Sequence, residues 1–191
     1  MKWGDMTEPK HTVIKVEPAV MKLTGGNFKM TAFRPLADGH PCYALVGMIA
    51  AETARIERMV EQSICHVAEI DLKVGASITG QMIGPAPRFN ALLQLARNRG
   101  MPEAILKRIK ATNGHANTHF ERRNRAVHDP WIEDVTTGET HQDRGKPKSS
   151  PAFGPTPVSE QELKDTLGEL RKYRAEVTDL VSDIWVELHS S

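Results

Sequence analysis

The sequence has few cysteines, few aromatic residues and almost no net charge, and each shortage argues against a class of protein. Its two cysteines, Cys42 and Cys65, cannot build a disulfide framework, and they form no Cys-x-x-Cys pair of the kind that binds zinc. Aromatic residues make up 5% of the 191 residues, which is few for a β-sandwich or barrel and favours helices. The 25 Lys and Arg residues balance 24 Asp and Glu residues, which argues against broad electrostatic binding of nucleic acid.

Long apolar runs are also missing. The N-terminus has no apolar stretch of signal-peptide length. The longest uninterrupted apolar stretch, around residues 44–51, is far shorter than the roughly 20 residues that a membrane span needs. We therefore expect a soluble, cytoplasmic protein that makes no membrane contact.

The apolar spacing predicts an all-α helical bundle over residues 42–189, preceded by an irregular N-terminal arm over 1–41 that is rich in proline and glycine. The expected helices cover residues 42–70, 88–99, 102–112, 115–128 and 159–188. We expect Asn113-Gly114 to end one helix, so that two long helices of ~40–45 Å flank shorter ones. Residues 133–158 predict a long loop insertion, with a short hairpin across Gly138.

The last of these helices has two further signals. Ser159 and Glu162 form a capping box at its start. Its apolar residues then follow a seven-residue repeat that is broken only at Arg174. This repeat predicts a packing seam against another helix.

One dense polar segment lies between His119 and Trp131. On a helical wheel, Asn124 shares the apolar sector of Phe120 and Trp131, while Arg123 and His128 lie on its two shoulders. A polar side chain on an apolar face costs free energy unless it is hydrogen-bonded. The pattern therefore predicts a polar site at a helix–helix contact.

The run Arg123-Asn124-Arg-Ala-Val-His128 resembles the signature of the HEPN superfamily, in which an Arg and a polar residue precede a His by a few positions. The looser resemblance extends from about residue 42 to 188. It implies a HEPN-like helical bundle with two long helices, and metal-independent RNA cleavage of the toxin or defence type. It also implies a symmetric homodimer in which each chain supplies one motif to a shared cleft.

The chemistry of these residue types suits that implied activity. Histidine titrates near neutral pH, so His128 can remove a proton from a ribose 2′-hydroxyl or deliver one to the leaving oxygen. Arg123 can meet the growing phosphoryl charge with a fixed, permanently charged fork. Asn124 can orient His128 or hold a phosphate oxygen. Arg123, His128 and Asn124 are therefore the expected catalytic residues.

Other residues are expected to support them. Glu52 and Glu57 are candidates to pair with Arg123 or His128 from the first helix, and His119 is expected near the cleft. We expect Arg122 and Arg125 to point toward solvent and to contact the RNA backbone, as members of a local basic run.

Two alternatives remain open. The first is a non-catalytic dimerisation or interaction module in which Arg123, Asn124 and His128 fix the register of packed helices. The second is a metal site that uses His115 and His119, although the residue after His115 is not the Glu of zinc-binding His-Glu-x-x-His helices. We expect no cofactor and no metal, and RNA and an antitoxin protein are the candidate partners.

Overall fold

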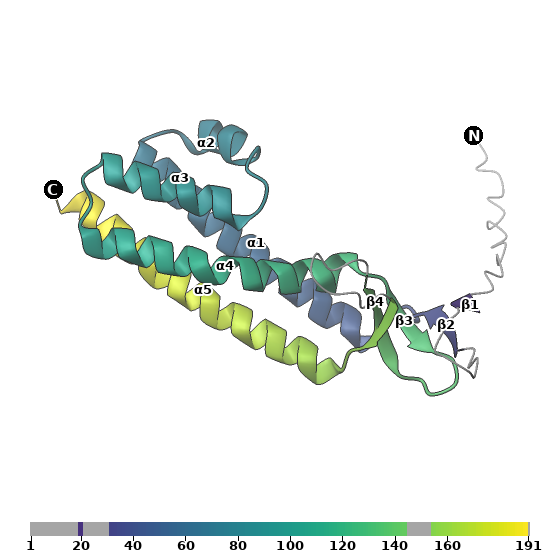
Figure 1. Cartoon of the computed structure of the whole chain (residues 1–191). Coiled ribbons are helices and arrows are strands. Elements are labelled where there is room, and N and C mark those ends of the chain that lie inside the picture. The colour runs from purple at the N-terminus through teal and green to yellow at the C-terminus, as the bar shows by residue number, and fades with distance from the viewer. Residues whose placement is uncertain (1–18, 21–30, 145–153, 191) are drawn as a thin grey trace, which may run out of the picture.

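The computed structural model describes residues 19–20, 31–144 and 154–190. Figure 1 shows long helices side by side, with a small sheet at one end of the bundle. The helices are α1 (Pro41–Ala68), α2 (Leu72–Thr79), α3 (Pro85–Asn98), α4 (Glu103–His128) and α5 (Glu160–His189). The strands are β1 (Ala19–Val20), β2 (Thr31–Pro35), β3 (Trp131–Asp134), β4 (Thr140–Arg144) and β5 (Gly154–Pro157).

Helices α1, α4 and α5 form the main body, and their longest shared interface is between α1 and α5. The predicted repeat of α5 faces this interface. Its residues Leu170, Val177 and Ile184 are almost completely buried, as are Ile49 and Ile56 of α1. The expected packing seam is therefore confirmed, and burial of these apolar faces is the main source of stability.

The predicted break at Asn113-Gly114 is wrong, because α4 is one helix of 26 residues. Asn113 Nδ2 donates to Asn90 Oδ1 of α3 at 3.2 Å, and Tyr173 Oη of α5 donates to the Thr112 carbonyl oxygen at 3.1 Å. Tertiary packing on both sides thus outweighs the low helix propensity of the Asn-Gly pair. The bundle has a third long helix, which at ~1.5 Å per residue is about 39 Å long.

The fold is mostly helical rather than purely all-α, because an antiparallel sheet in the order β1-β2-β3-β4-β5 closes one end. Residues 31–35, predicted to be irregular, form strand β2, in which Phe33 is buried. This strand pairs with β3, so its partner lies about 100 positions away in the sequence, with Phe33 opposite Asp134. The rest of the expected arm, residues 1–18 and 21–30, lies outside the described residues.

The expected hairpin across Gly138 is confirmed by the pairing of β3 with β4. In the turn between β3 and β4, the Asp134 carboxylate accepts hydrogen bonds from the Thr136 and Thr137 amides at 2.7 and 3.2 Å. These bonds favour the ionised form and lower the pKa of Asp134. Gly138 has a φ of 72°, a left-handed conformation that glycine adopts without a steric cost.

The expected capping box is also present at the start of α5. The Glu162 amide donates to Ser159 Oγ at 3.1 Å, and the Ser159 amide donates to Glu162 Oε2 at 2.7 Å. This end of α5 lies beside the sheet (Figure 1). In the described part of the chain, no helix is both long and apolar enough to cross a membrane.

The continuity of α4 predicts that Gly114→Ala stabilises the protein by about 0.5–1 kcal/mol, because alanine is the better helix former. An added Cβ at Gly114 would meet no atom within 4 Å. Urea denaturation followed by circular dichroism measures the change. The matched control is Gly100→Ala, which we expect to destabilise by about 1–2 kcal/mol because Gly100 has a φ of 70°. Destabilisation by Gly114→Ala would contradict an uninterrupted α4.

Candidate functional site

The predicted catalytic residues come together in the last two turns of α4. Arg123 Nη1 donates to Asn124 Oδ1 at 2.9 Å and lies 3.3 Å from His128 Nε2. Because a guanidinium can only donate, this contact is a hydrogen bond in the tautomer of His128 that carries its ring proton on Nδ1 and leaves Nε2 to accept. Asn124 and His128 are exposed and Arg123 is half-buried.

The expected helix–helix contact over Asn124 does not form among the described residues. Helix α3 lies alongside only the first part of α4 (Figure 1). Its first two turns, with Pro85 and Phe89, border a narrow crevice beside Phe120. Beyond that point the same face of α4 continues without α3, so Asn124 is exposed although it shares the sector of buried Phe120.

The sheet holds the end of α4 through two of the helix's last carbonyl groups. Trp131 Nε1 donates to the Ala126 carbonyl oxygen at 2.9 Å, and Gln142 Nε2 donates to the Arg125 carbonyl oxygen at 3.0 Å. Both donor side chains are buried. The turn that carries His128 is therefore anchored by β3 and β4. Trp131 satisfies the Ala126 carbonyl group at the helix end, and Gln142 adds a second bond to the Arg125 carbonyl group, which also accepts from the Asp129 amide.

Glu52 and Glu57 have partners other than the motif. Glu57 Oε1 accepts from Arg88 Nη1 of α3 at 2.9 Å. Glu52 is 5% exposed, and its Oε2 lies 2.8 Å from Arg174 Nε of α5. Arg55 and Arg171 also lie within 4 Å of Glu52. Among the described residues, neither carboxylate forms the expected pair with Arg123 or His128.

His119 faces α5 and stacks on Tyr173, with ring centroids 4.6 Å apart. Burial, and the nearby positive charge of Arg122, lower its pKa. His115, one turn earlier, has its Nδ1 3.3 Å from Glu176 Oε2. Neither histidine forms a hydrogen bond with Arg123 or His128 within the described chain. Nor do the described residues contain a group of three His, Cys, Asp or Glu side chains placed to hold a metal ion.

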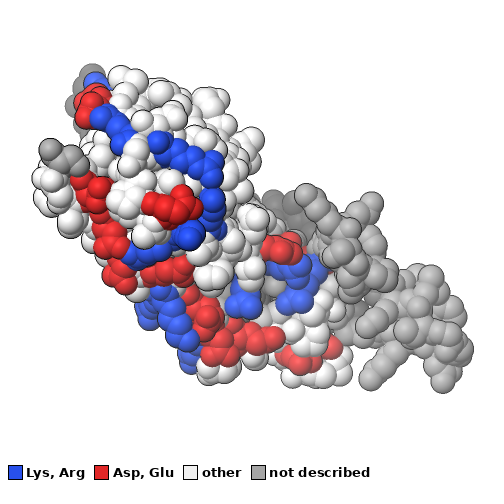
Figure 2. All heavy atoms as spheres, turned by 60° about the vertical axis from the view of Figure 1, so that its left-hand side comes forward, with Lys and Arg blue, Asp and Glu red and all other residues white. Residues whose placement is uncertain are grey.

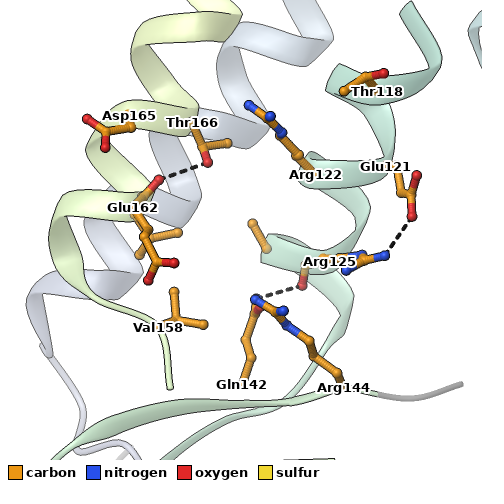
Figure 3. Close-up of a pocket in the computed structure, with 12 residues that line it drawn as sticks. Thr118, Glu121, Arg122, Arg125, Gln142, Arg144, Val158, Glu162, Asp165 and Thr166 are labelled. Carbon is orange, nitrogen blue, oxygen red and sulfur yellow. Dashed lines mark hydrogen bonds and ion pairs between the residues drawn. The ribbon is translucent and has the colours of Figure 1, made fainter. Parts of the chain in front are cut away.

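A cavity of about 470 Å³ lies between α4, β4 and the first turns of α5. The sequence predicts that Arg122 and Arg125 point toward solvent. In the structure both residues line this cavity. Figure 3 shows Arg122 extending from α4 toward α5, and Gln142 and Arg144 reaching up from β4. The sequence pattern did not identify Gln142, Arg144 or the facing Glu162. They are distant from the motif in sequence, and only the fold brings them to α4.

The two groups of polar residues occupy different sides of α4. Arg122 and Arg125 line the cavity, whereas Arg123 and His128 do not. Figure 2 shows positive and negative side chains interspersed over one face of the bundle, rather than a field of one sign. On that face, the positive side chains therefore do not form an extended basic surface.

Comparison of the chain with protein-family models, with curated proteins and with solved structures gives no significant match.

The position of His119 predicts a titration midpoint below the ordinary histidine value of 6.5. The unfolded chain then binds this proton more readily than the folded chain. The stability that His119 contributes is present above pH 6.5 and is lost as the pH falls from that value through the lowered pKa. A proton NMR titration, with the resonance assigned by His119→Gln, measures the midpoint. Arg122→Gln should raise it and Arg97→Gln should not, and a midpoint above 6.5 would contradict the burial.

Proposed function

We propose that this protein is a cytoplasmic, metal-independent endoribonuclease of the HEPN type that acts as a symmetric dimer. One observation carries the proposal: Arg123 Nη1 lies 3.3 Å from His128 Nε2 on the anchored last turns of α4. His128 is exposed there, so a phosphate can reach it. A solvent-accessible Arg–His pair supplies both a fixed positive charge and a proton-transfer group.

In the proposed reaction, an arriving phosphodiester competes with His128 for the guanidinium of Arg123. Arg123 then donates to the phosphoryl oxygens, and the lone pair of His128 Nε2 becomes free. His128 takes the proton of the ribose 2′-hydroxyl, whose oxygen attacks phosphorus, and the bond to the 5′-oxygen breaks. The products are a 2′,3′-cyclic phosphate and a 5′-hydroxyl, which receives its proton from a second acid.

That second acid is the reason for proposing a dimer. One chain contributes one His128, and among the described residues no other histidine is hydrogen-bonded to Arg123. A two-fold axis beside the open face of α4 would bring His128 of a second protomer to the same phosphodiester. One histidine would then act as base and the other as acid.

A non-catalytic interaction module is the second candidate, and a different surface favours it. Apolar side chains are exposed on and just after α2, where Val74, Ile78 and Ile83 are 53%, 49% and 92% exposed. Figure 2 shows a largely uncharged area in the upper part of the view, over α2 and α3. Exposed apolar patches mark interaction surfaces. An antitoxin remains a candidate partner under either function.

The nuclease proposal is tested on a mixed RNA pool in the presence of EDTA. We expect wild-type protein to cleave RNA, and Arg123→Ala and His128→Ala each to reduce the rate by about 10²–10⁴-fold, because positioned proton transfer and charge stabilisation are lost. Asn124→Ala should have a smaller effect. End-group analysis of the products should show 2′,3′-cyclic phosphates.

The matched controls are Arg97→Ala and His66→Ala, which replace exposed residues near the ends of α3 and α1. Both should retain the wild-type rate. Light scattering and circular dichroism establish that each variant keeps its oligomeric state and fold. Cleavage that is absent, or that persists equally in the motif variants, would overturn the ribonuclease proposal.

A further inference from the structure

The cavity between α4, β4 and α5 has two walls of opposite charge. Its α4 and β4 wall carries Arg122, Arg125 and Arg144, while its α5 wall carries Glu162 and Asp165. Glu121 also lines the cavity, but it is paired with Arg125 at 2.7 Å. A ligand that matches this separation has an anionic group at one end and hydrogen-bond donors at the other.

The arginine wall has side-chain hydrogen-bond donors that have no partner among the described residues. The side chains of Arg122 and Arg144 make no hydrogen bond or ion pair with any described residue, and Arg144 Nε is buried without a partner. An unpaired buried donor costs free energy until a ligand or water satisfies it. Figure 3 shows Arg122 and Arg144 entering the cavity from different elements, with their guanidinium groups at different ends of it. Both contact one anionic group when these long side chains turn toward it.

The α5 wall offers acceptors for the other end of the ligand. Glu162 uses Oε2 for the capping box, and within the described residues its Oε1 has no hydrogen-bond partner. Figure 3 shows this carboxylate directed toward the cavity. Asp165 lies one turn further along α5 and accepts a bond from Gln161 Nε2 at 2.8 Å. Carboxylate oxygens at such a position accept bonds from the amino and imino groups of a nucleobase.

We propose that this cavity binds a nucleoside monophosphate, with its phosphate held by Arg122 and Arg144 and its base edge held by Glu162. The volume of about 470 Å³ lies within the range of small-molecule sites, roughly 300–1,000 Å³. Guanine presents two adjacent donors on one edge and is therefore the best-matched base. Binding here does not depend on cleavage at His128, because His128 does not line the cavity.

Isothermal titration calorimetry of the full chain tests the site with GMP, AMP, CMP and UMP, with guanosine, and with inorganic phosphate. We expect GMP to bind at least about tenfold more tightly than guanosine or phosphate alone, because only GMP contacts both walls. A 5′-phosphorylated trinucleotide beginning with G presents the same unit. Tighter binding of the trinucleotide than of GMP would assign the site to RNA ends, and the reverse would assign it to a free nucleotide.

Three substitutions test the contribution of each cavity wall to binding separately. Arg122→Gln and Arg144→Gln should each weaken GMP binding by about tenfold or more and leave guanosine binding unchanged, since each removes a charged donor to the phosphate. Glu162→Gln should reduce the preference for GMP over phosphate, and glutamine can still complete the capping box. Arg97→Gln is the matched control on α3 and should bind GMP normally, as should His128→Ala.

Two results would overturn the inference. One is GMP binding no tighter than binding of inorganic phosphate. The other is tight GMP binding that Arg122→Gln, Arg144→Gln and Glu162→Gln all leave unchanged. Loss of GMP binding in His128→Ala would instead place the nucleotide at the proposed cleavage site, and so would distinguish failure of this inference from failure of the ribonuclease proposal.

Discussion

The pairing of Glu52 with Arg174 within the interface between α1 and α5 is the constraint on which the bundle depends. Each is a charged residue on a largely apolar stripe: Glu52 interrupts the buried face of α1, and Arg174 breaks the repeat of α5. A buried carboxylate without a partner is strongly destabilising, and the register that buries both apolar stripes brings Arg174 and Arg171 of α5 to Glu52, in addition to Arg55 of α1. With Oε2 and Nε 2.8 Å apart, the pair favours this alignment of the two helices over others.

The alignment of α1 and α5 in turn determines where α4 and the sheet lie. Helix α4 packs on both helices, and Tyr173 of α5 bonds to its backbone at Thr112. At the far end of α4, Trp131 and Gln142 bond to the carbonyl groups of its last turns. These contacts hold one short helical segment that presents Arg123 and His128 on one side and Arg122 and Arg125 on another. Two chemically different sites can therefore share the last two turns of one helix.

The helices that bury a wide apolar stripe could be predicted from the sequence, and so could the capping box at Ser159. Those features depend on residues close together along the chain, and their periodicity records which face is buried. Asn113-Gly114 gave the wrong prediction, because the local preference of these residues to end a helix is weaker than the contacts that Asn90 and Tyr173 make with this segment. Strand β2 could not be predicted, because its partner Asp134 lies about 100 residues further along the chain.

The candidate site, like the fold, was determined partly by the sequence alone and partly by the tertiary structure. The proximity of Arg123, Asn124 and His128 was determined by the sequence alone, since residues one to five apart on a helix are neighbours whatever surrounds them. Only the tertiary structure decided that Asn124 is exposed, because the length of α3 sets how much of α4 it covers. Only the tertiary structure, again, directed Glu57 to Arg88 and brought Arg144 and Glu162 to opposite walls of one cavity. Helical periodicity predicts which residues share a face of one helix. Which element packs against that face depends on segments that are distant in the sequence and are brought together only by the tertiary fold.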